Sequence, residues 1–376
     1  MQTCTSRRRA LAAGAAALVA PRVWAASRGG ERFTLGQSAP LTGPGALGGR
    51  QFRDAASRWF ERAARPDAPR VDLVTLDDGG EVERALTNAK LLTANHGAVG
   101  FFGFCGAGAN REGMLAAAEE QVPFIAPVSG MEVLRQREQR GVFLLRASHR
   151  DEIRQVIRHT RSIGMTRLGL LFEYESAGWE IRDAFTAAAQ AAQLAASPVA
   201  SVPRGSADVQ AAVAALTAAE VQGLILAANP AASAAFVRAA RAAGYRGSFY
   251  TLSTVGGKAL LDALGPLAVG ISVAQVVPFP WGGGSAVSRD FLAFCEAVRI
   301  EPDFASMEGY LAARWLTETL QRARPRDAGA AALATALASA PSLELSGFPL
   351  ALNPETRSLS SFVELTVVGS SLRFRR

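Results

Sequence analysis

The chain repeatedly alternates short apolar runs with amphipathic stretches, and this alternation constrains its fold more than any other feature. Runs such as Phe33 to Ala39 and Gly223 to Ala227 have the length and apolar content of buried strands. Each is followed by a segment with helical spacing of apolar residues, such as Gln51 to Ala64. Strands that alternate with helices form parallel sheets with helices on both faces. The pattern therefore predicts an α/β fold with doubly wound sheets.

The repeats fall into two sets, which predicts two lobes. The first set ends near Val142 to Arg146, and the second begins with a helix over Asp151 to Ile163. A mature chain of about 350 residues also exceeds one ordinary core. Further elements expected later in the chain are a strand over Val269 to Val277, helices over Val287 to Arg299 and Phe304 to Ala323, and antiparallel strands around Phe362 to Val368 and Leu372 to Arg375.

Residues 1–25 have the features of a secretory signal peptide. Three arginines, Arg7 to Arg9, precede the apolar run Ala10 to Val19, and small residues near Ala25 suit a cleavage site there. The arginines leave both the general secretory and the twin-arginine routes open. The apolar run is shorter than the roughly 20 residues of a spanning helix. We therefore expect a soluble, periplasmic mature protein.

Charge and cysteine content exclude some classes of function. Removal of residues 1–25 takes away four of the 40 basic residues and no acid, which leaves 36 basic against 33 acidic residues and a net charge of +3. With no basic, aromatic-rich cluster, nucleic acid is not an expected partner. Cys105 and Cys295 remain in an oxidising compartment and could pair. We favour two buried thiols, because nothing in the sequence brings them together.

A glycine-rich loop follows the first predicted strand. Gly43 to Gly48 has the spacing of a dinucleotide-binding loop, but Pro44 has no N–H to offer a phosphate. The acidic pair after the second strand begins 29 residues beyond Gly48, where that motif needs about 20. A structural turn is one alternative. We favour a ligand-facing loop that includes Leu41 and Thr42, with no cofactor.

The sequence lacks the motifs of common enzymes. Its three histidines have no metal-binding spacing, no G-x-S-x-G elbow occurs, and no G-x-x-x-x-G-K-[ST] loop occurs. We expect no catalytic residue and no metal site, and thus not an enzyme.

Several strand-end segments together resemble one known family. They are "FTLGQSAPLTGPGALGGRQFRDAA", "VDLVTLDDGGEVERALTNAKLL", "GFFGFCGAGAN", "VPFIAPVSGMEVLR", "FLLRASHRDE", "GLLFEYESAGWE", "GYRGSFYTLSTVGG" and "GISVAQVVPFPW". They are similar to the type I periplasmic binding proteins of ABC importers, in particular the leucine/isoleucine/valine-binding branch. The resemblance covers nearly all of the mature chain.

The resemblance implies a specific architecture and mode of action. Two doubly wound, Rossmann-like lobes would be joined by a three-crossover hinge. Lobe 1 would comprise residues 26–147 plus 276–345, and lobe 2 residues 148–275 plus 346–376. The lobes would close on a small ligand, and the protein, a monomer, would then dock on a membrane permease.

The resemblance also implies ligand contacts in lobe 1. The loop that holds a ligand carboxylate in amino-acid binders corresponds to Phe104, Cys105, Gly106 and Ala107, with Ala107 where serine or threonine is usual. The second anchoring loop corresponds to Val128, Ser129 and Gly130. A helix N-cap is the alternative role for Ser129.

In lobe 2 the implied contacts are less regular. The usual tyrosine is replaced by Ala177, although Tyr174 and Trp179 lie nearby and could contact the ligand or pack in the core. Further candidates are Asn229, which an ordinary turn would also explain, and Ser253 and Thr254, where amino-acid binders present an acid. Near the first predicted crossover, Arg146 could bind an anion or form a structural salt bridge. The missing acid and the missing hydroxyl weaken the case for a standard α-amino acid.

Taken together, these features predict an extracytoplasmic receptor that delivers a small amino acid, amide or organic acid to an ABC importer by cleft closure. The alternative is a ligand sensor of the same fold that acts on a regulatory or signalling partner. Neighbouring permease and ATPase genes, or their absence, would separate the two.

Overall fold

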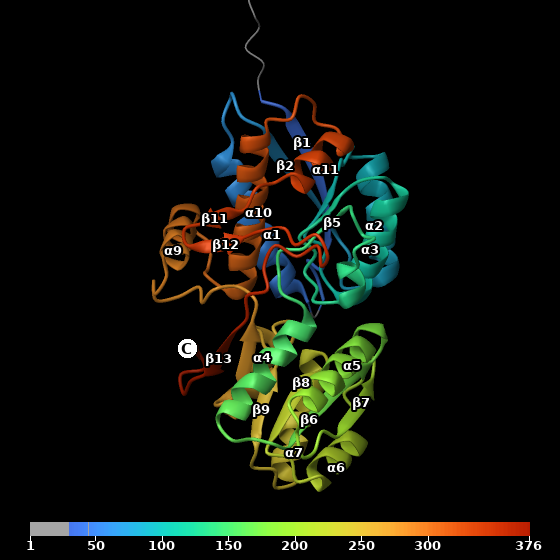
Figure 1. Cartoon of the computed structure of the whole chain (residues 1–376), viewed down its shortest axis with the longest axis vertical. Helices are drawn as coiled ribbons and strands as arrows, with labels where there is room; N and C mark the ends of the chain where they lie inside the picture. The colour runs from blue at the N-terminus through green and yellow to red at the C-terminus, as the bar shows by residue number, and fades with distance from the viewer. Residues whose placement is uncertain (1–29, 44) are drawn as a thin grey trace, which may run out of the picture.

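The computed structural model describes residues 30–43 and 45–376, and these form two α/β lobes stacked along the long axis of the molecule (Figure 1). The predicted signal peptide, residues 1–25, lies outside the described residues. Two lobes with mostly parallel sheets are the architecture that the alternating sequence predicts, so the predicted fold class is confirmed. No helix in the described part of the chain is both long and apolar enough to cross a membrane.

Lobe 1 is built on a five-stranded sheet in the order β2-β1-β3-β4-β5. All its neighbours are parallel, and β1 and β2 are in register from Arg32 opposite Arg70 to Ala39 opposite Asp77. The carboxyl ends of parallel strands meet at one edge, so the loops after them lie together. The strands are β1 (Arg32–Ala39), β2 (Arg70–Asp77), β3 (Phe101–Phe102), β4 (Phe124–Ile125) and β5 (Val142–Phe143).

Helices cover both faces of this sheet. On one face α1 packs closely against α10. The two helices can approach because Gly309 has no side chain, since a Cβ at this position would lie 2.3 Å from the carbonyl oxygen of Phe52. Phe52, Trp315 and Leu316 belong to the core between them. The other face is covered by α2 and α3. The helices of this lobe are α1 (Ala46–Ala63), α2 (Val82–Ala94), α3 (Ala107–Glu119), the short 3-10 helix η1 (Glu132–Arg135), α9 (Ala286–Val298), α10 (Phe304–Ala323) and α11 (Ala330–Ala338).

Lobe 2 is built on a seven-stranded sheet in the order β14-β13-β10-β9-β8-β6-β7. The strands from β10 to β7 run parallel, whereas β13 and β14 are antiparallel to their neighbours. The strands are β6 (Leu168–Tyr174), β7 (Val199–Pro203), β8 (Gly223–Ala227), β9 (Ser248–Thr251), β10 (Ser272–Gln275), β13 (Glu364–Val368) and β14 (Phe374–Arg375). The helices are α4 (His149–Ser162), α5 (Ser176–Ala191), α6 (Gln210–Ala218), α7 (Pro230–Ala242), α8 (Lys258–Leu264) and the 3-10 helix η2 (Gly265–Ala268).

The chain passes between the lobes three times. It leaves lobe 1 after β5, returns to it after β10, and leaves again before β13. The hairpin of β11 (Leu343–Leu345) and β12 (Phe348–Leu350), with Leu359, packs in the core of lobe 1, so the last passage falls between Leu359 and Glu364. The stretch from residue 346 to Leu359, expected in lobe 2, therefore packs with lobe 1, because β12 pairs with β11 and buries its apolar residues there. The other residue limits of the two lobes stay a prediction.

Individual elements differ from expectation mainly at their ends. The helix expected over Phe304 to Ala323 is α10 with those bounds, whereas the strand expected over Val269 to Val277 is reduced to the four residues of β10. A strand extends only as far as its neighbours supply ladder partners, which an apolar run cannot reveal. In the described part of the chain Cys105 and Cys295 are free thiols; Cys295 is buried as expected, whereas Cys105 is only half-buried.

Candidate functional site

The first crossover carries a buried arginine that contacts both lobes. Arg146 has only 2% of its surface exposed. Its Nη2 donates to the hydroxyl of Ser253 in the loop after β9, and its Nε lies 3.5 Å from Oε1 of Glu308 on α10. Its Nη1 is buried and has no hydrogen-bond acceptor among the described residues. Arg146 therefore joins the strand-end region of lobe 2 to a helix of lobe 1.

A second buried carboxylate meets the same loop. Oε2 of Glu152 accepts from the backbone N of Ser253 at 2.6 Å, and Oε1 accepts from its hydroxyl at 3.1 Å. Burial raises the pKa of Glu152 to about 7 and also raises that of Glu308, while the charge of Arg146 opposes both shifts. Glu308 thus lies directly beside the buried guanidinium of Arg146, and Glu152 is linked to it through the hydroxyl of Ser253.

Neither Ser253 nor Thr254 is an acid, yet the structure brings a carboxylate next to Ser253 from another element. Glu152 lies on the buried face of α4 with Ile153, Val156 and Ile157. A glutamate within the apolar stripe of an amphipathic helix is the sequence signal that would have identified it. Thr254 itself is exposed.

The loop after β3 contains one core residue, Phe104, followed by a glycine with free space beside its backbone. Phe104 is fully buried, with ring centroids 5.2 Å from Phe101 and 5.5 Å from Phe124, so its side chain belongs to the core. The Cys105 thiol donates to the carbonyl of Gly103 at 3.4 Å, and burial raises its pKa. Gly106 has φ +95° and precedes Ala107, the first residue of α3. A side chain at Gly106 would meet open space.

The loop after β4 is tied to the previous one. Val128 donates its backbone N–H to the carbonyl of Phe104 at 2.8 Å. Nδ2 of Asn110 donates to the carbonyls of Gly106 at 2.8 Å and Val128 at 3.3 Å, while its buried Oδ1 has no partner among the described residues. Among the described residues, the hydroxyl of Ser129 takes part in one long bond, which it accepts from Met131 N at 3.3 Å.

Gly130 lets the first residue of α4, His149, lie in contact with this loop. Its carbonyl accepts from the backbone N of His149 at 2.9 Å, and a side chain at Gly130 would lie 2.3 Å from the imidazole. Both ring nitrogens of His149 are buried without a partner in the described chain. Burial, helped by the charges of Arg146 and Arg135, lowers the pKa of His149 to about 3, so the ring is neutral.

Leu41 and Thr42, after β1, are held by one carboxylate. Oδ1 of Asp77 accepts from the backbone N of Leu41 at 2.8 Å and of Gly79 at 2.9 Å, and Oδ2 accepts from the Thr42 hydroxyl at 2.7 Å. These bonds lower the pKa of Asp77, the Thr42 hydroxyl most of all. The Thr42 side chain is therefore engaged in holding the loop.

The remaining lobe 2 candidates form two separate groups. Tyr174 is 60% exposed and lies edge-on to Trp179 at 4.7 Å, and Trp179 also packs on Phe172 of the lobe 2 core. Asn229 caps α7 by accepting from Ala232 N at 3.0 Å, and its Nδ2 donates to Oε1 of Glu173 at 3.0 Å. Neither group contacts Arg146.

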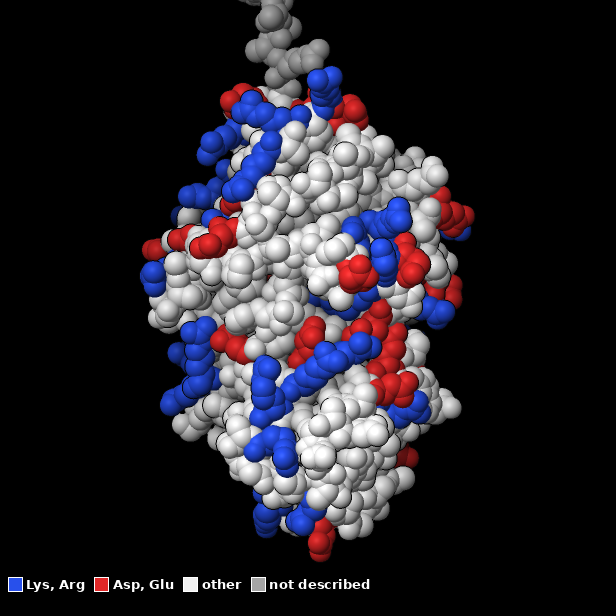
Figure 2. Space-filling model, viewed as in Figure 1, with Lys and Arg blue, Asp and Glu red and all other residues white. Residues whose placement is uncertain are grey.

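The structure therefore brings some of the predicted residues together and leaves others apart. Arg146 meets Ser253, and the loops carrying Phe104 to Ala107 and Val128 to Gly130 are joined to each other. Figure 2 shows the molecule narrowing between the lobes, where basic and acidic side chains gather. Sequence reasoning missed the positioning carboxylates Glu152, Glu308 and Asp77. No group of three histidine, cysteine or acidic side chains in the described ranges could hold a metal ion.

Comparisons with known proteins agree with this architecture. The family model described as periplasmic binding protein matches residues 33–369. A substrate-binding periplasmic protein from Ralstonia solanacearum shares 28% identity with a TM-score of 0.81, covering 91% of this chain and 99% of that one. A possible leucine/isoleucine/valine-binding protein from Rhodopirellula baltica SH 1 has a TM-score of 0.84 at 24% identity, covering 92% and 97%.

A putative branched-chain amino acid ABC transporter from Rhodospirillum rubrum is similar at a TM-score of 0.66 and 22% identity, covering 92% of this chain and 99% of that one. Curated proteins provide no match to the sequence.

Proposed function

The chain belongs to the periplasmic binding protein family, and from that premise we propose that it is an extracytoplasmic receptor delivering a small solute to an ABC importer. It acts by binding alone and catalyses no reaction. Its partners are the solute and a membrane permease complex, and it works as a monomer.

The observation that carries this proposal is the position of Arg146. This buried arginine lies where the chain first leaves lobe 1, and it contacts Ser253 of lobe 2 and Glu308 of lobe 1. A solute between the strand-end loops would meet groups from both lobes. Buried polar atoms near these loops that lack a partner among the described residues, Nη1 of Arg146 and Oδ1 of Asn110, are the kind of groups that a ligand satisfies.

Lobe closure is the proposed mechanism, with the three chain passages as the hinge. On the side of α5, Oε2 of Glu180 accepts from the backbone N of Glu132 at 2.7 Å, and Ala177 belongs to a hydrophobic cluster of lobe 1 that also contains Leu134. These lobe contacts are local and partly polar, so the lobes can separate without exposing a large apolar surface.

The surroundings of Ser253 bear on the class of solute. Both oxygens of Glu152 already accept hydrogen bonds from Ser253, so a ligand ammonium would have to compete for them. Ala107 brings no hydroxyl to the loop after β3. We propose a small amino acid, amide or organic acid, with amides and simple carboxylates bound at least as well as leucine.

Thermal-shift measurements with a panel of amino acids, their amides and small carboxylates test the proposal. A ligand present at about 100 times its dissociation constant should stabilise the protein by about 2.7 kcal/mol. Ser129→Ala should reduce the shift, whereas Ser162→Ala, on the exposed end of α4, should not. A panel without any shift would overturn the ligand classes, and a preference for leucine would overturn the interpretation of Glu152.

Export to the periplasm by residues 1–25 is part of the same proposal. Expressed at full length, the protein should appear in the periplasmic fraction shortened at Ala25. A variant that lacks residues 2–25 should stay in the cytoplasm. Retention of the full-length chain inside the cell would contradict the proposed localisation, whatever solute it binds.

A further inference from the structure

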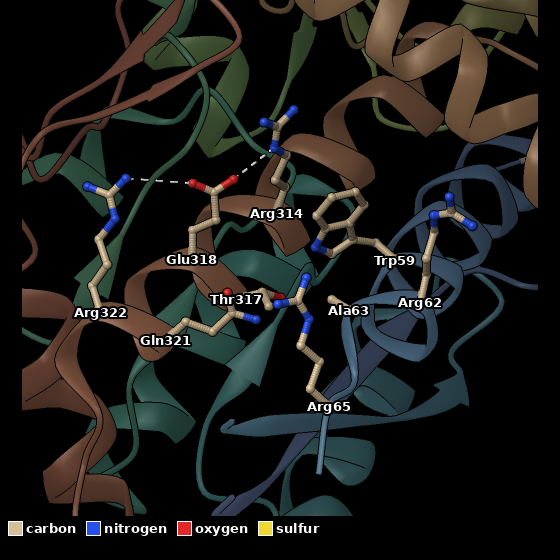
Figure 3. Close-up of a pocket in the computed structure, with 9 residues that line it drawn as sticks. All are labelled: Trp59, Arg62, Ala63, Arg65, Arg314, Thr317, Glu318, Gln321 and Arg322. Atoms are coloured by element: carbon tan, nitrogen blue, oxygen red, sulfur yellow. Dashed lines mark hydrogen bonds and ion pairs between the residues drawn. The ribbon is translucent and has the colours of Figure 1, made fainter. Parts of the chain in front are cut away.

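A pocket of about 440 Å³ lies on the outer side of lobe 1, at the C-terminal ends of α1 and α10 (Figure 3). Its wall includes Trp59, Arg62, Arg65, Arg314, Glu318 and Arg322. Along α10, Glu318 lies ten residues beyond Glu308, which is about 15 Å at the helical rise. The pocket is therefore separate from the lobe junction.

Positive charge is in excess in this pocket. Four arginines face one carboxylate, that of Glu318, and this carboxylate is already engaged. Its oxygens lie 2.9 Å from Nε of Arg314 and 3.9 Å from Nη2 of Arg322. The guanidinium groups of Arg62 and Arg65 have no hydrogen bond or ion pair with the residues that the structure describes. An added anion would therefore meet cations that no acid neutralises.

The pocket also has a donor without an acceptor. Nε1 of Trp59 is buried and has no hydrogen-bond partner within the described chain. The indole is held by Tyr310, edge-on at 5.1 Å, and by Phe294 at 5.7 Å, so it has little freedom to turn away. Figure 3 shows the indole nitrogen on the side of the ring that faces Arg65 and Thr317. An unpaired buried N–H costs free energy that an external acceptor would recover.

Helix ends explain only part of this arrangement. Arg62 and Arg322 lie in the last turns of α1 and α10, where the helix dipole favours a cation. That effect accounts for two of the four charges. It accounts neither for Arg65, which lies beyond α1, nor for the unsatisfied N–H of Trp59.

We propose that this pocket binds a small oxyanion with two or more negative charges, a phosphate or a polycarboxylate. One oxygen accepts from Nε1 of Trp59, and the others accept from the guanidinium groups of Arg62 and Arg65, whose forked donors match such oxygens. Both arginines are exposed, so binding weakens as ionic strength rises. This site goes beyond the proposed solute receptor and does not depend on it.

The indole N–H signal of Trp59 in a ¹⁵N-labelled protein provides the test, once Trp59→Phe has assigned it. Inorganic phosphate and citrate are titrated separately at constant ionic strength, with chloride as the reference. A saturable shift of this signal with either anion, absent with chloride, supports the site and identifies which oxyanion it accepts. Binding in the lobe junction would not move this signal, so the outcome is independent of the solute panel.

Paired variants complete the test. The double variant Arg62→Gln, Arg65→Gln should bind the anion at least tenfold more weakly than the wild-type protein. Arg154→Gln combined with Arg158→Gln, two exposed arginines of α4 in lobe 2, should leave the titration unchanged. No saturable shift with either anion, or equal affinity in both double variants, would overturn the proposal.

Discussion

The strand-end loops of the two lobes differ in how far their polar groups are already used. In lobe 2, Glu173 accepts from Gly205 N at 2.7 Å and from both the backbone and the side chain of Asn229. In lobe 1, the loops after β3 and β4 carry Gly106, Ala107 and the weakly bonded Ser129. A carboxylate thus holds these loops of lobe 2, as Asp77 holds the loop after β1 in lobe 1, whereas the loops after β3 and β4 of lobe 1 keep small residues and backbone groups with few internal partners next to the junction.

This difference assigns different tasks to the two sets of loops. Groups that hold one another determine shape, and breaking them should cost stability. Groups with few internal partners contribute little to stability and are available to a solute. Substitutions that change stability without changing ligand binding, or the reverse, can therefore test this difference between the loops directly.

The largest effect is expected at Arg146, where the two lobes meet. Arg146→Met leaves the carboxylates of Glu152 and Glu308 buried without their cation. Removal of one member of a buried charge cluster typically costs about 3–5 kcal/mol. Urea unfolding at pH 7.5 measures the loss, and Arg154→Met, on the exposed face of α4, should change stability by less than about 0.5 kcal/mol.

A double variant separates charge from packing. Adding Glu308→Gln to Arg146→Met removes one unpaired carboxylate and should recover part of the lost stability. If the double variant is no more stable than Arg146→Met alone, the cost lies in lost packing and the electrostatic interpretation is wrong.

A smaller but pH-dependent effect is expected at Glu152. Its pKa is 4.5 ordinarily and about 7 in the folded protein. Between these values the folded state holds a proton that the unfolded state has lost, so the free energy of unfolding falls as pH rises through this window. The fall amounts to about 3 kcal/mol for a shift of this size. Glu152→Gln should flatten this part of the curve.

Unfolding free energies at several pH values between 4.5 and 7.5 check this expectation. Glu296→Gln, at an exposed acid of α9, should follow the wild-type curve. Parallel curves for wild type and Glu152→Gln would show that Glu152 titrates normally despite its burial.

A third effect concerns the loops of lobe 2 whose polar groups form hydrogen bonds with one another. Asn229→Ala removes the cap of α7 and the bond to Glu173, with an expected cost of about 1–2 kcal/mol. Asn229→Ser can still cap the helix and should cost less. If both variants unfold at the same urea concentration as the wild-type protein, the hydrogen bonds of Asn229 do not hold the loops of lobe 2.

The fold was predictable from the sequence to a greater extent than the site. Periodicity identifies elements such as α10, because burial of one helix face is a local property of the sequence. The ordered strand-end motifs identified the family, which the match over residues 33–369 confirms. Ends of strands such as β10 depend on neighbouring strands and were less predictable.

The contacts at the junction join residues far apart in sequence. Arg146 and Ser253 are 107 positions apart, and Glu152 and Ser253 are 101 apart. Sequence spacing carries no information on such distances, so the carboxylates at the junction were not found. A charged residue within an apolar stripe, as at Glu152, is the feature that deserved the most weight. The ligand contacts themselves stay predictions.

The smallest effect is expected at Ser129, in the open loops of lobe 1. Its hydroxyl accepts a single bond of 3.3 Å from Met131 N, so Ser129→Ala should change the free energy of unfolding by less than about 0.5 kcal/mol. Ser148→Ala is the matched control, because that hydroxyl belongs to the capping box of α4 and its loss should cost about 1 kcal/mol. Equal losses in the two variants would mean that the Ser129 hydroxyl holds its loop as the carboxylates hold those of lobe 2. In that case the hydroxyl is not free to bind a solute, and the contrast between the lobes would be confined to Gly106 and Ala107.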